Sequence, residues 1–217
     1  MMVGVYAREV RRSKARIKWM GGEVSAVLYG DDGIPFLLAH GAGTGQDHPR
    51  MVALAEELAD RGLLVLTFNY PYTEAGRKSP DRQAVLLDCH RAARDYLGEL
   101  AGSLPVLAGR SMGGRMGTYL AAAQEPCRAV VLYAYPLHPP GKPDQLRIEH
   151  LPDIKVPMLF FQGTRDALSR MDLFDLHIRP LPTTDIEILD GASHSLDRNQ
   201  ATTVGLAERT AAWVSVL

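Results

Sequence analysis

The segment GRSMGG, which begins at Gly109, limits the possible folds of this chain more than any other stretch. It contains the pattern Gly-x-Ser-x-Gly, between an apolar run at residues 104–108 and a helix-forming run at residues 115–124. A strand, a tight turn and a helix in this order form a nucleophile elbow, in which a strained serine lies at the tip of the turn. Gly109 and Gly113 lack a Cβ, so the strand and the helix can approach closely. The pattern predicts that Ser111 is held clear of the sheet, at the positive end of the helix dipole.

Apolar runs alternate with helical periodicity along the chain. After a hairpin predicted around Gly21 at residues 15–30, apolar runs predict strands at residues 34–39, 63–68, 104–108, 127–135, 156–162 and 186–189. Helices are predicted from residues 47–49 to Gly62 and at residues 80–100, 115–124, 167–176 and 200–216. This alternation favours an α/β fold in which helices cover both faces of a mostly parallel sheet. The length of 217 residues fits a single domain, residues 1–217.

In the helix predicted at residues 80–100, the sequence pattern predicts which side chains are buried and which are exposed. Ser79 suits its N-cap, and Pro80 suits its first helical position. His90 lies off the apolar stripe, so we expect it to face solvent. The predicted stripe consists of Leu86, Cys89, Ala93, Tyr96 and Leu100.

The overall composition argues against several classes of protein. The formal net charge of −1 provides no global field for nucleic acid or a membrane surface. No apolar run reaches the about 18 residues of a transmembrane helix, and no apolar stretch follows the basic residues from Arg8 to Arg16, so no signal peptide is expected. The two cysteines, Cys89 and Cys127, have no metal-ligand spacing and indicate a reducing compartment. We therefore expect a cytoplasmic protein without a metal or an organic cofactor, and make no prediction of its oligomeric state.

Three residues that follow apolar runs form a candidate catalytic set. Ser111 needs a base to remove its proton, and His194 suits that role because imidazole titrates near neutral pH. Asp166 follows the strand before that of His194 and is the candidate acid that orients it. Active groups of open parallel sheets lie beyond the carboxyl ends of the strands, where all three residues are predicted. Competing acids are Asp144, which follows an earlier strand, Asp172, expected in solvent, and Asp190, expected to point aside.

Acyl transfer also requires hydrogen-bond donors for a developing oxyanion. The backbone N–H of Met112 is one candidate, and the loop after the strand at residues 34–39 supplies the second from Ala42 or, as an alternative, Gly43. Each pocket candidate suits a structural role as well, and His40 suits the role of holding its own loop. The candidates for the substrate pocket are His40, Gly43, Tyr70, Arg110 and His138.

Several short motifs together resemble those of one superfamily. HGAG, GRSMGGRM, GTRDAL and GASHSL are similar to motifs of α/β-hydrolases of the dienelactone-hydrolase-like group. QDHP, FNYPY and YPLHPPG more closely resemble the small family of testis-expressed protein thirty and a subunit of the NSL chromatin complex. The resemblance covers roughly residues 15–217. It implies an α/β-hydrolase fold with Ser111 as nucleophile, Asp166 as acid and His194 as base, but no substrate, because some relatives are protein-interaction modules.

Together, these observations predict a serine hydrolase that acts on carboxylic esters. No long insertion follows the strand predicted at residues 127–135, so the helical cap of many lipases is not expected. The predicted partner is a small ester or acyl substrate. A thioesterase or a small peptidase would use the same triad, and a binding or scaffold protein that retains the fold is the alternative from another class.

Overall fold

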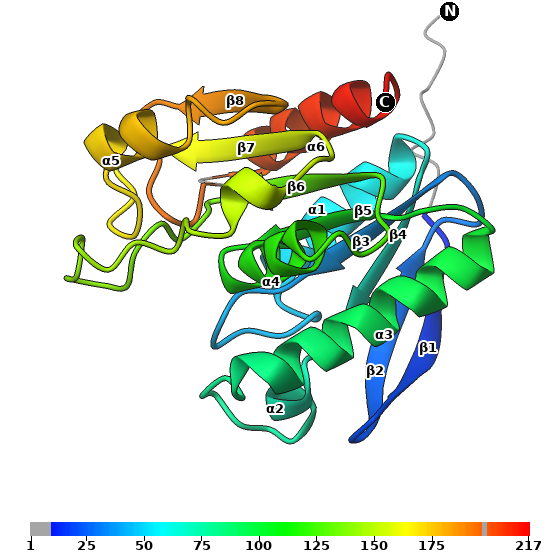
Figure 1. Cartoon of the computed structure of the whole chain (residues 1–217). Coiled ribbons are helices and arrows are strands. Elements are labelled where there is room, and N and C mark those ends of the chain that lie inside the picture. Colours follow the sequence, from blue (N-terminus) through cyan, green and yellow to red (C-terminus); the bar gives the residue numbers. More distant parts are fainter. Residues whose placement is uncertain (1–9, 197–198) are drawn as a thin grey trace, which may run out of the picture.

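The chain forms an eight-stranded sheet with helices on both faces, as seen in a computed structural model (Figure 1). The structure describes residues 10–196 and 199–217, so Arg8, part of the basic stretch considered above, lies outside the described residues. The strands are β1 (Arg12–Trp19), β2 (Gly22–Tyr29), β3 (Ile34–Ala39), β4 (Leu63–Phe68), β5 (Val106–Arg110), β6 (Ala129–Tyr133), β7 (Met158–Gly163) and β8 (Thr184–Leu189). The helices are α1 (Pro49–Asp60), α2 (Pro71–Glu74), α3 (Gln83–Ala101), α4 (Met112–Ala122), α5 (Met171–His177) and α6 (Gln200–Val214), with a 3-10 helix, η1 (Leu151–Asp153).

The strands lie in the order β1-β2-β4-β3-β5-β6-β7-β8. β1 and β2 form the predicted hairpin, β2 is antiparallel to β4, and the remaining neighbours are parallel. β3 and β4 begin and end where their apolar runs predict. β5 extends to Arg110 because its backbone pairing continues past the apolar run, as far as Tyr133 of β6. The predicted mostly parallel α/β sheet is confirmed.

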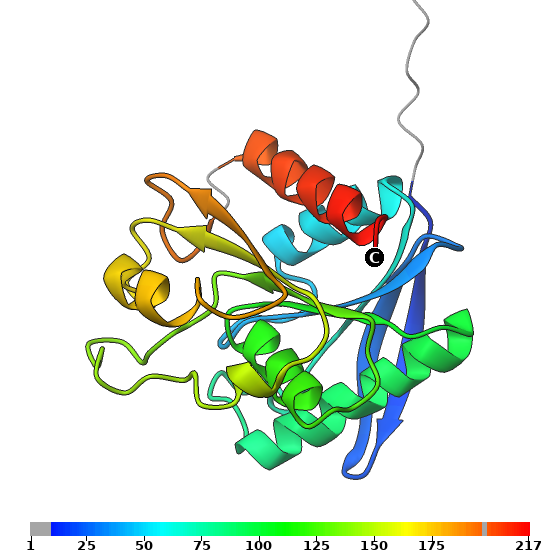
Figure 2. The same cartoon turned by 45° about the horizontal axis from the view of Figure 1, so that its top comes forward.

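Different helices cover the two faces of the sheet (Figure 2). α1 and α6 pack side by side on one face, and α3 and α4 pack on the other. Phe36 and Leu38 of β3 belong to the buried cluster of Leu206 in α6, whereas Leu37 belongs to that of Leu97 in α3. Because strand side chains alternate between faces, a strand covered on both faces needs the continuous apolar run that predicted it.

Helix α3 differs from its prediction in its start and in its buried face. It begins at Gln83, so Ser79 lies before the helix and does not cap it. His90, expected in solvent, is fully buried, whereas Leu100, expected in the stripe, is 52% exposed. α3 packs on α4, β1 and β3, and these neighbours bury a wider face than one apolar stripe predicts. The hydroxyl of Tyr70 forms a hydrogen bond with the buried ring of His90, and helical periodicity does not reveal this contact.

The carboxyl ends of the parallel strands are not covered by a further domain. The connection between β6 and β7 contains η1 and otherwise no helix or strand, in agreement with the absence of a predicted cap. In Figure 1 these strand ends lie at the left side of the sheet, where the loops after β6 and β7 gather. None of the helices within the described ranges is long and apolar enough to cross a lipid bilayer.

Candidate active site

Ser111 lies in the strained turn that its motif predicts. Its backbone angles are φ 49° and ψ −115°, outside the regions that residues with a side chain ordinarily occupy. The Ser111 N–H donates to the carbonyl of Tyr133 in β6 at 2.9 Å, which fixes the turn against the sheet. A Cβ on Gly113 would lie 2.5 Å from a carbonyl oxygen of β3, and one on Gly109 would lie 2.3 Å from a backbone nitrogen of α4. Both positions therefore require glycine, and their close contacts hold Ser111 at the start of α4.

Ser111, His194 and Asp166 form a continuous hydrogen-bonded chain. Ser111 Oγ lies 2.8 Å from His194 Nε2. His194 Nδ1 lies 2.8 Å from Asp166 Oδ2 and 3.0 Å from Oδ1. The Asp166 side chain is fully buried, whereas 30% of the His194 side chain is exposed. The imidazole thus connects a buried carboxylate to a hydroxyl at the edge of the sheet.

Two further donors orient the Asp166 carboxylate. Gln162 Nε2 donates to Oδ2 at 2.9 Å, and the N–H of Leu168 donates to Oδ1 at 2.8 Å. Each oxygen therefore has a partner besides His194, which restricts how the carboxylate can turn. Gln162 was not among the predicted site residues. Its signal in the sequence is an amide at the end of the otherwise apolar β7, directly before the turn that carries Asp166.

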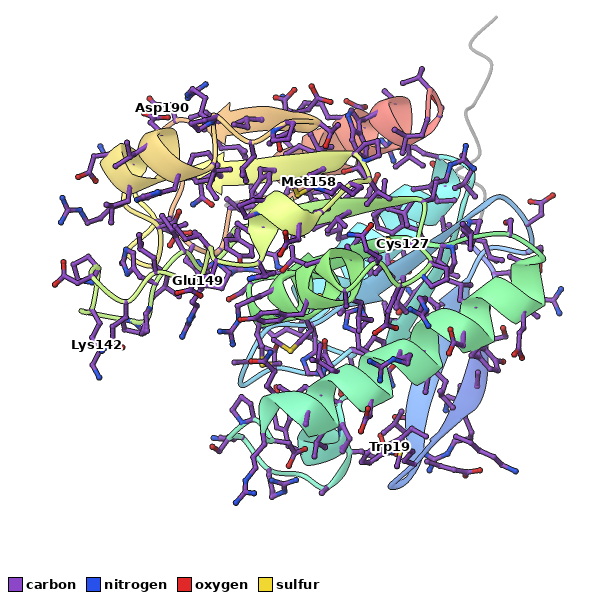
Figure 3. The ribbon with its side chains drawn as sticks, viewed as in Figure 1. Trp19, Cys127, Lys142, Glu149, Met158 and Asp190 are labelled. Carbon is purple, nitrogen blue, oxygen red and sulfur yellow. The ribbon has the colours of Figure 1, made fainter. Side chains whose placement is uncertain are left out.

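The competing acids do not contact the ring of His194. Asp172 pairs with an arginine two residues before it, at 2.5 Å. Asp190 accepts a hydrogen bond from a threonine of the loop after β7, at 3.1 Å, and Figure 3 shows it beside the end of β8. Asp144 is exposed on the connection after β6. Within the described residues, Asp166 is the one carboxylate that bonds to His194.

Arg110 joins the nucleophile turn to the histidine loop. Its guanidinium donates to the carbonyl oxygen of Ser195, the residue after His194. The same loop is held from another side by the N–H of Arg165, which donates to the carbonyl of Ala192 at 2.9 Å. Arg110 therefore lies beside Ser111 and holds the segment that carries His194.

The loop after β3 lies against the nucleophile, with His40 beneath it. A Cβ on Gly41 would lie 3.6 Å from the Cβ of Ser111. His40 is fully buried; its Nδ1 donates to the Gly41 carbonyl at 2.8 Å, and its Nε2 accepts from the N–H of Tyr70 at 3.2 Å. Burial lowers the pKa of His40 to about 4, so the ring is neutral near neutral pH. His40 holds its loop and exposes no surface to a pocket.

Two backbone N–H groups border Ser111 and suit an oxyanion. Met112 is the first residue of α4, so its N–H has no acceptor within the helix. Ala42 is exposed, and its N–H donates to no atom of the described residues. Gly43, the alternative donor, is also exposed. Ala42 and its alternative Gly43 are therefore both candidates for the second donor.

Tyr70 and His138 do not line an open pocket, contrary to their candidacy. Tyr70 is fully buried, and its hydroxyl lies 2.8 Å from His90 Nδ1. His138 is 2% exposed; its Nδ1 faces the carbonyl of Pro139 at 3.0 Å, and its Nε2 accepts from the N–H of Arg170 at 3.4 Å. Both residues follow strands, as predicted, but the loops around them fold over their rings. The sequence therefore placed both residues at the correct edge of the sheet, but the prediction that their side chains are exposed in a pocket was wrong.

The remaining reactive groups do not gather into a second centre. Among residues 10–196 and 199–217, no group of three His, Cys, Asp or Glu side chains is arranged to hold a metal ion. Burial raises the pKa of the Cys89 thiol to about 12 and that of Cys127 to about 11, so neither thiol ionises near neutral pH. The hydroxyl, imidazole and carboxylate at the strand ends suit nucleophilic attack on a carbonyl carbon.

Comparisons with known proteins agree with this fold. The chain is similar to a dienelactone hydrolase from Anabaena variabilis, with 21% identity and a TM-score of 0.76 over 95% of this chain and 97% of that chain. It is similar to an alpha-beta serine hydrolase homologue from Coxiella burnetii, with 16% identity and a TM-score of 0.73 over 92% and 95% of the two chains. A serine hydrolase without lid from Xanthomonas campestris matches with 19% identity and a TM-score of 0.72 over 92% and 93% of the two chains. The family model of the alpha/beta hydrolase domain matches residues 32–216, and the chain therefore belongs to this family.

Proposed function

We propose that this protein is a serine hydrolase that cleaves carboxylic esters, with Ser111 as its nucleophile. The observation that carries the proposal is the chain of hydrogen bonds from Ser111 through His194 to Asp166, at 2.8 Å for each step. Membership of the alpha/beta hydrolase domain family supports hydrolysis in general. The serine hydrolases among its structural neighbours support it too.

The reaction follows from the positions of the three side chains. Ser111 Oγ attacks the ester carbonyl carbon while His194 Nε2 takes the hydroxyl proton. As the tetrahedral intermediate collapses, the bond to the alcohol breaks and His194 returns the proton to the departing oxygen. Water then attacks the acyl-enzyme with the same help from His194, which releases the carboxylic acid and restores the Ser111 hydroxyl. Asp166 accepts a hydrogen bond from His194 Nδ1 throughout and stabilises the imidazolium.

Negative charge on the carbonyl oxygen needs donors that are already in place. The N–H groups of Met112 and Ala42 are the proposed oxyanion hole. Met112 also lies at the N-terminal end of α4, where the helix dipole favours negative charge. Donors of this kind contribute on the order of a hundredfold to a thousandfold in kcat.

Several finer assignments belong to the same proposal. The substrate is a small ester or acyl compound, handled without a metal or organic cofactor by one domain, residues 1–217. We place the protein in the cytoplasm, with neither nucleic acid nor a membrane as partner. The short motifs around residues 46–49, 68–72 and 135–141 support kinship with the group of testis-expressed protein thirty. A thioesterase or a small peptidase would use the same triad, and a scaffold protein would not use it at all.

Labelling with a fluorophosphonate probe tests the proposal directly. We expect the folded wild-type protein to be labelled and Ser111→Ala to remain unlabelled, because the probe reacts only with an activated serine. A matched series of oxygen ester, thioester and amide with one short acyl group then assigns the bond that is cleaved. Faster cleavage of the thioester or the amide would replace the ester assignment. Absence of labelling in the folded wild-type protein would favour a binding or scaffold role.

A further inference from the structure

Among residues 10–196 and 199–217, Arg115 and Arg147 have no counter-ion, unlike many other arginines of this protein. Arg16, Arg61, Arg91 and Arg94, for example, each pair with a glutamate. Within the described residues, neither the Arg115 nor the Arg147 side chain donates a hydrogen bond or forms an ion pair, although both side chains are half-buried. The Nε of Arg115 is buried and has no acceptor in the part of the chain that the structure describes. Partly buried cations without partners are costly, and such groups ordinarily have an anion nearby.

The two guanidinium groups lie close enough to affect each other. The pKa of Arg147 is lowered, first by burial and then by the charge of Arg115. Burial and then the charge of Arg115 lower the pKa of His150 to about 4. The His150 ring is therefore neutral near neutral pH and does not add a third positive charge beside the two arginines. Two half-buried guanidinium groups that lie near each other repel. One oxyanion bound by both would stabilise them, because guanidinium presents donors that match a carboxylate or phosphate.

Arg115 lies one helical turn after the nucleophile, on α4. Its backbone N–H donates to the carbonyl of Ser111 at 3.1 Å, which places it one helical turn after the serine. Side chains of a helix lean toward its N-terminus and cover the preceding turn. We therefore expect the Arg115 side chain to extend toward the turn that begins at Ser111.

Arg147 is held beside α4 by the connection after β6. Its N–H donates to the carbonyl of Leu137 at 2.9 Å, and its carbonyl accepts from the hydroxyl of Tyr135 at 2.7 Å. Three residues further on, His150 Nε2 lies 2.8 Å from Thr118 Oγ1 of α4. Figure 3 shows Glu149 of this connection beside α4. The two arginines thus come from segments that are fixed to each other.

We propose that Arg115 and Arg147 bind an anionic oxygen group of the substrate, such as a carboxylate, next to Ser111. This inference rests on the proposed hydrolase function and adds a class of substrate to it: esters with a negatively charged group a few bonds from the carbonyl. No chemical step involves the arginines, which position the substrate through charge-assisted hydrogen bonds.

Matched pairs of substrates test this selectivity. The p-nitrophenyl ester of succinic acid carries a free carboxylate on the acyl side, and that of succinamic acid is its neutral counterpart. The acetate esters of 4-hydroxybenzoic acid and 4-hydroxybenzamide place the same contrast on the alcohol side. We expect the wild-type enzyme to have a higher kcat/KM for the anionic member of one pair. The pair that shows this preference identifies which side of the ester reaches the arginines.

Three variants assign the preference to the site. Arg147→Met, on the connection, and Arg115→Met should each lower the ratio of anionic to neutral kcat/KM by about 10- to 100-fold. Arg128→Met is the control: it removes the same charge at the opposite end of the sheet, where Arg128 precedes β6 and donates to the carbonyl of Leu217. This control should leave the ratio unchanged. An equal loss in all three variants, or in none, would overturn the site.

A measurement without turnover separates this inference from the proposed function. Succinate should bind to the wild-type protein and to Ser111→Ala with equal affinity in a calorimetric titration, and at least tenfold more weakly to Arg147→Met. This result would support the anion site even if no ester were hydrolysed. Hydrolysis that depends on Ser111, combined with no succinate binding and equal rates for both members of each pair, would overturn the anion site and leave the serine hydrolase in place.

Discussion

Two histidine–hydroxyl pairs in this molecule have the same hydrogen-bond length and different surroundings. Ser111 Oγ lies 2.8 Å from His194 Nε2, and Tyr70 Oη lies 2.8 Å from His90 Nδ1. The other nitrogen of His194 bonds to the buried Asp166 carboxylate. The other nitrogen of His90 has no partner among the described residues.

This difference distinguishes the pair of Ser111 and His194, which can transfer a proton, from the pair of Tyr70 and His90, which has a structural role. His194 is partly exposed, and the carboxylate behind it stabilises the imidazolium that forms when it takes a proton. His90 is fully buried, and burial lowers its pKa to about 3, so protonation of this ring is strongly disfavoured. A short distance between a hydroxyl and an imidazole is therefore not enough to identify a nucleophile. The partner of the far nitrogen and access to substrate decide the role.

Removal of the serine hydroxyl should have the largest effect. We expect Ser111→Ala to lower kcat by on the order of a millionfold while the melting temperature stays near that of the wild type, because the side chain faces the site. Tyr70→Phe removes the hydroxyl of the other pair and should keep kcat within a few-fold. Steady-state hydrolysis of a short ester and thermal unfolding measure both effects. Near wild-type turnover by Ser111→Ala would contradict the assignment of the nucleophile.

Removal of the charge behind His194 should have the next largest effect. Asp166→Asn keeps the shape of the side chain but no longer holds the imidazole in the required tautomer, so kcat should fall by up to about ten-thousandfold. Asp144→Asn alters an exposed acid that does not contact His194 and should change kcat little. If Asp144→Asn carried the larger loss of kcat, the acid would have to be reassigned.

The buried histidines should make the fold sensitive to acid. Burial lowers the pKa of His40 to about 4 and that of His90 to about 3, whereas histidine in the unfolded chain titrates near 6.5. Below pH 6.5 the unfolded chain therefore binds protons that the native state does not bind, so the free energy of unfolding falls as the pH falls. We expect a loss of roughly 2 kcal/mol for each ring between pH 7 and pH 5, measured by urea unfolding. A flat profile in wild-type protein, or the same slope in His90→Gln, would contradict this origin.

Breaking the structural pair should have the smallest effect, and only on stability. Tyr70→Phe leaves the buried Nδ1 of His90 without its partner, which costs about 1 to 3 kcal/mol in the free energy of unfolding. For a chain of this size, each kcal/mol lowers the melting temperature by about 2 to 4 °C. An unchanged melting temperature would mean that the hydrogen bond between Tyr70 and His90 does not contribute to stability.

The sequence by itself determined the elements that depend on local pattern. β3 and β4 match their apolar runs because a strand buried on both faces needs apolar residues at every position. The turn at Ser111 follows from Gly109 and Gly113, since any side chain there would overlap backbone atoms of β3 or α4. Ser111, Asp166 and His194 each follow a predicted strand, in this order, which placed them at one edge of a parallel sheet.

Tertiary structure alone decided which of these edge residues meet and which are buried. The preference for Asp166 over Asp144 rests on a hydrogen bond between loops 28 residues apart, a contact that no local pattern contains. Tyr70 and His138 follow strands, as Ser111 does, yet both rings are buried. Burial of a loop residue depends on the segments that pack over it, and those segments are distant in sequence. For the same reason, the support of Asp166 by Gln162 and the approach of Arg147 to Arg115 are visible only in the folded chain.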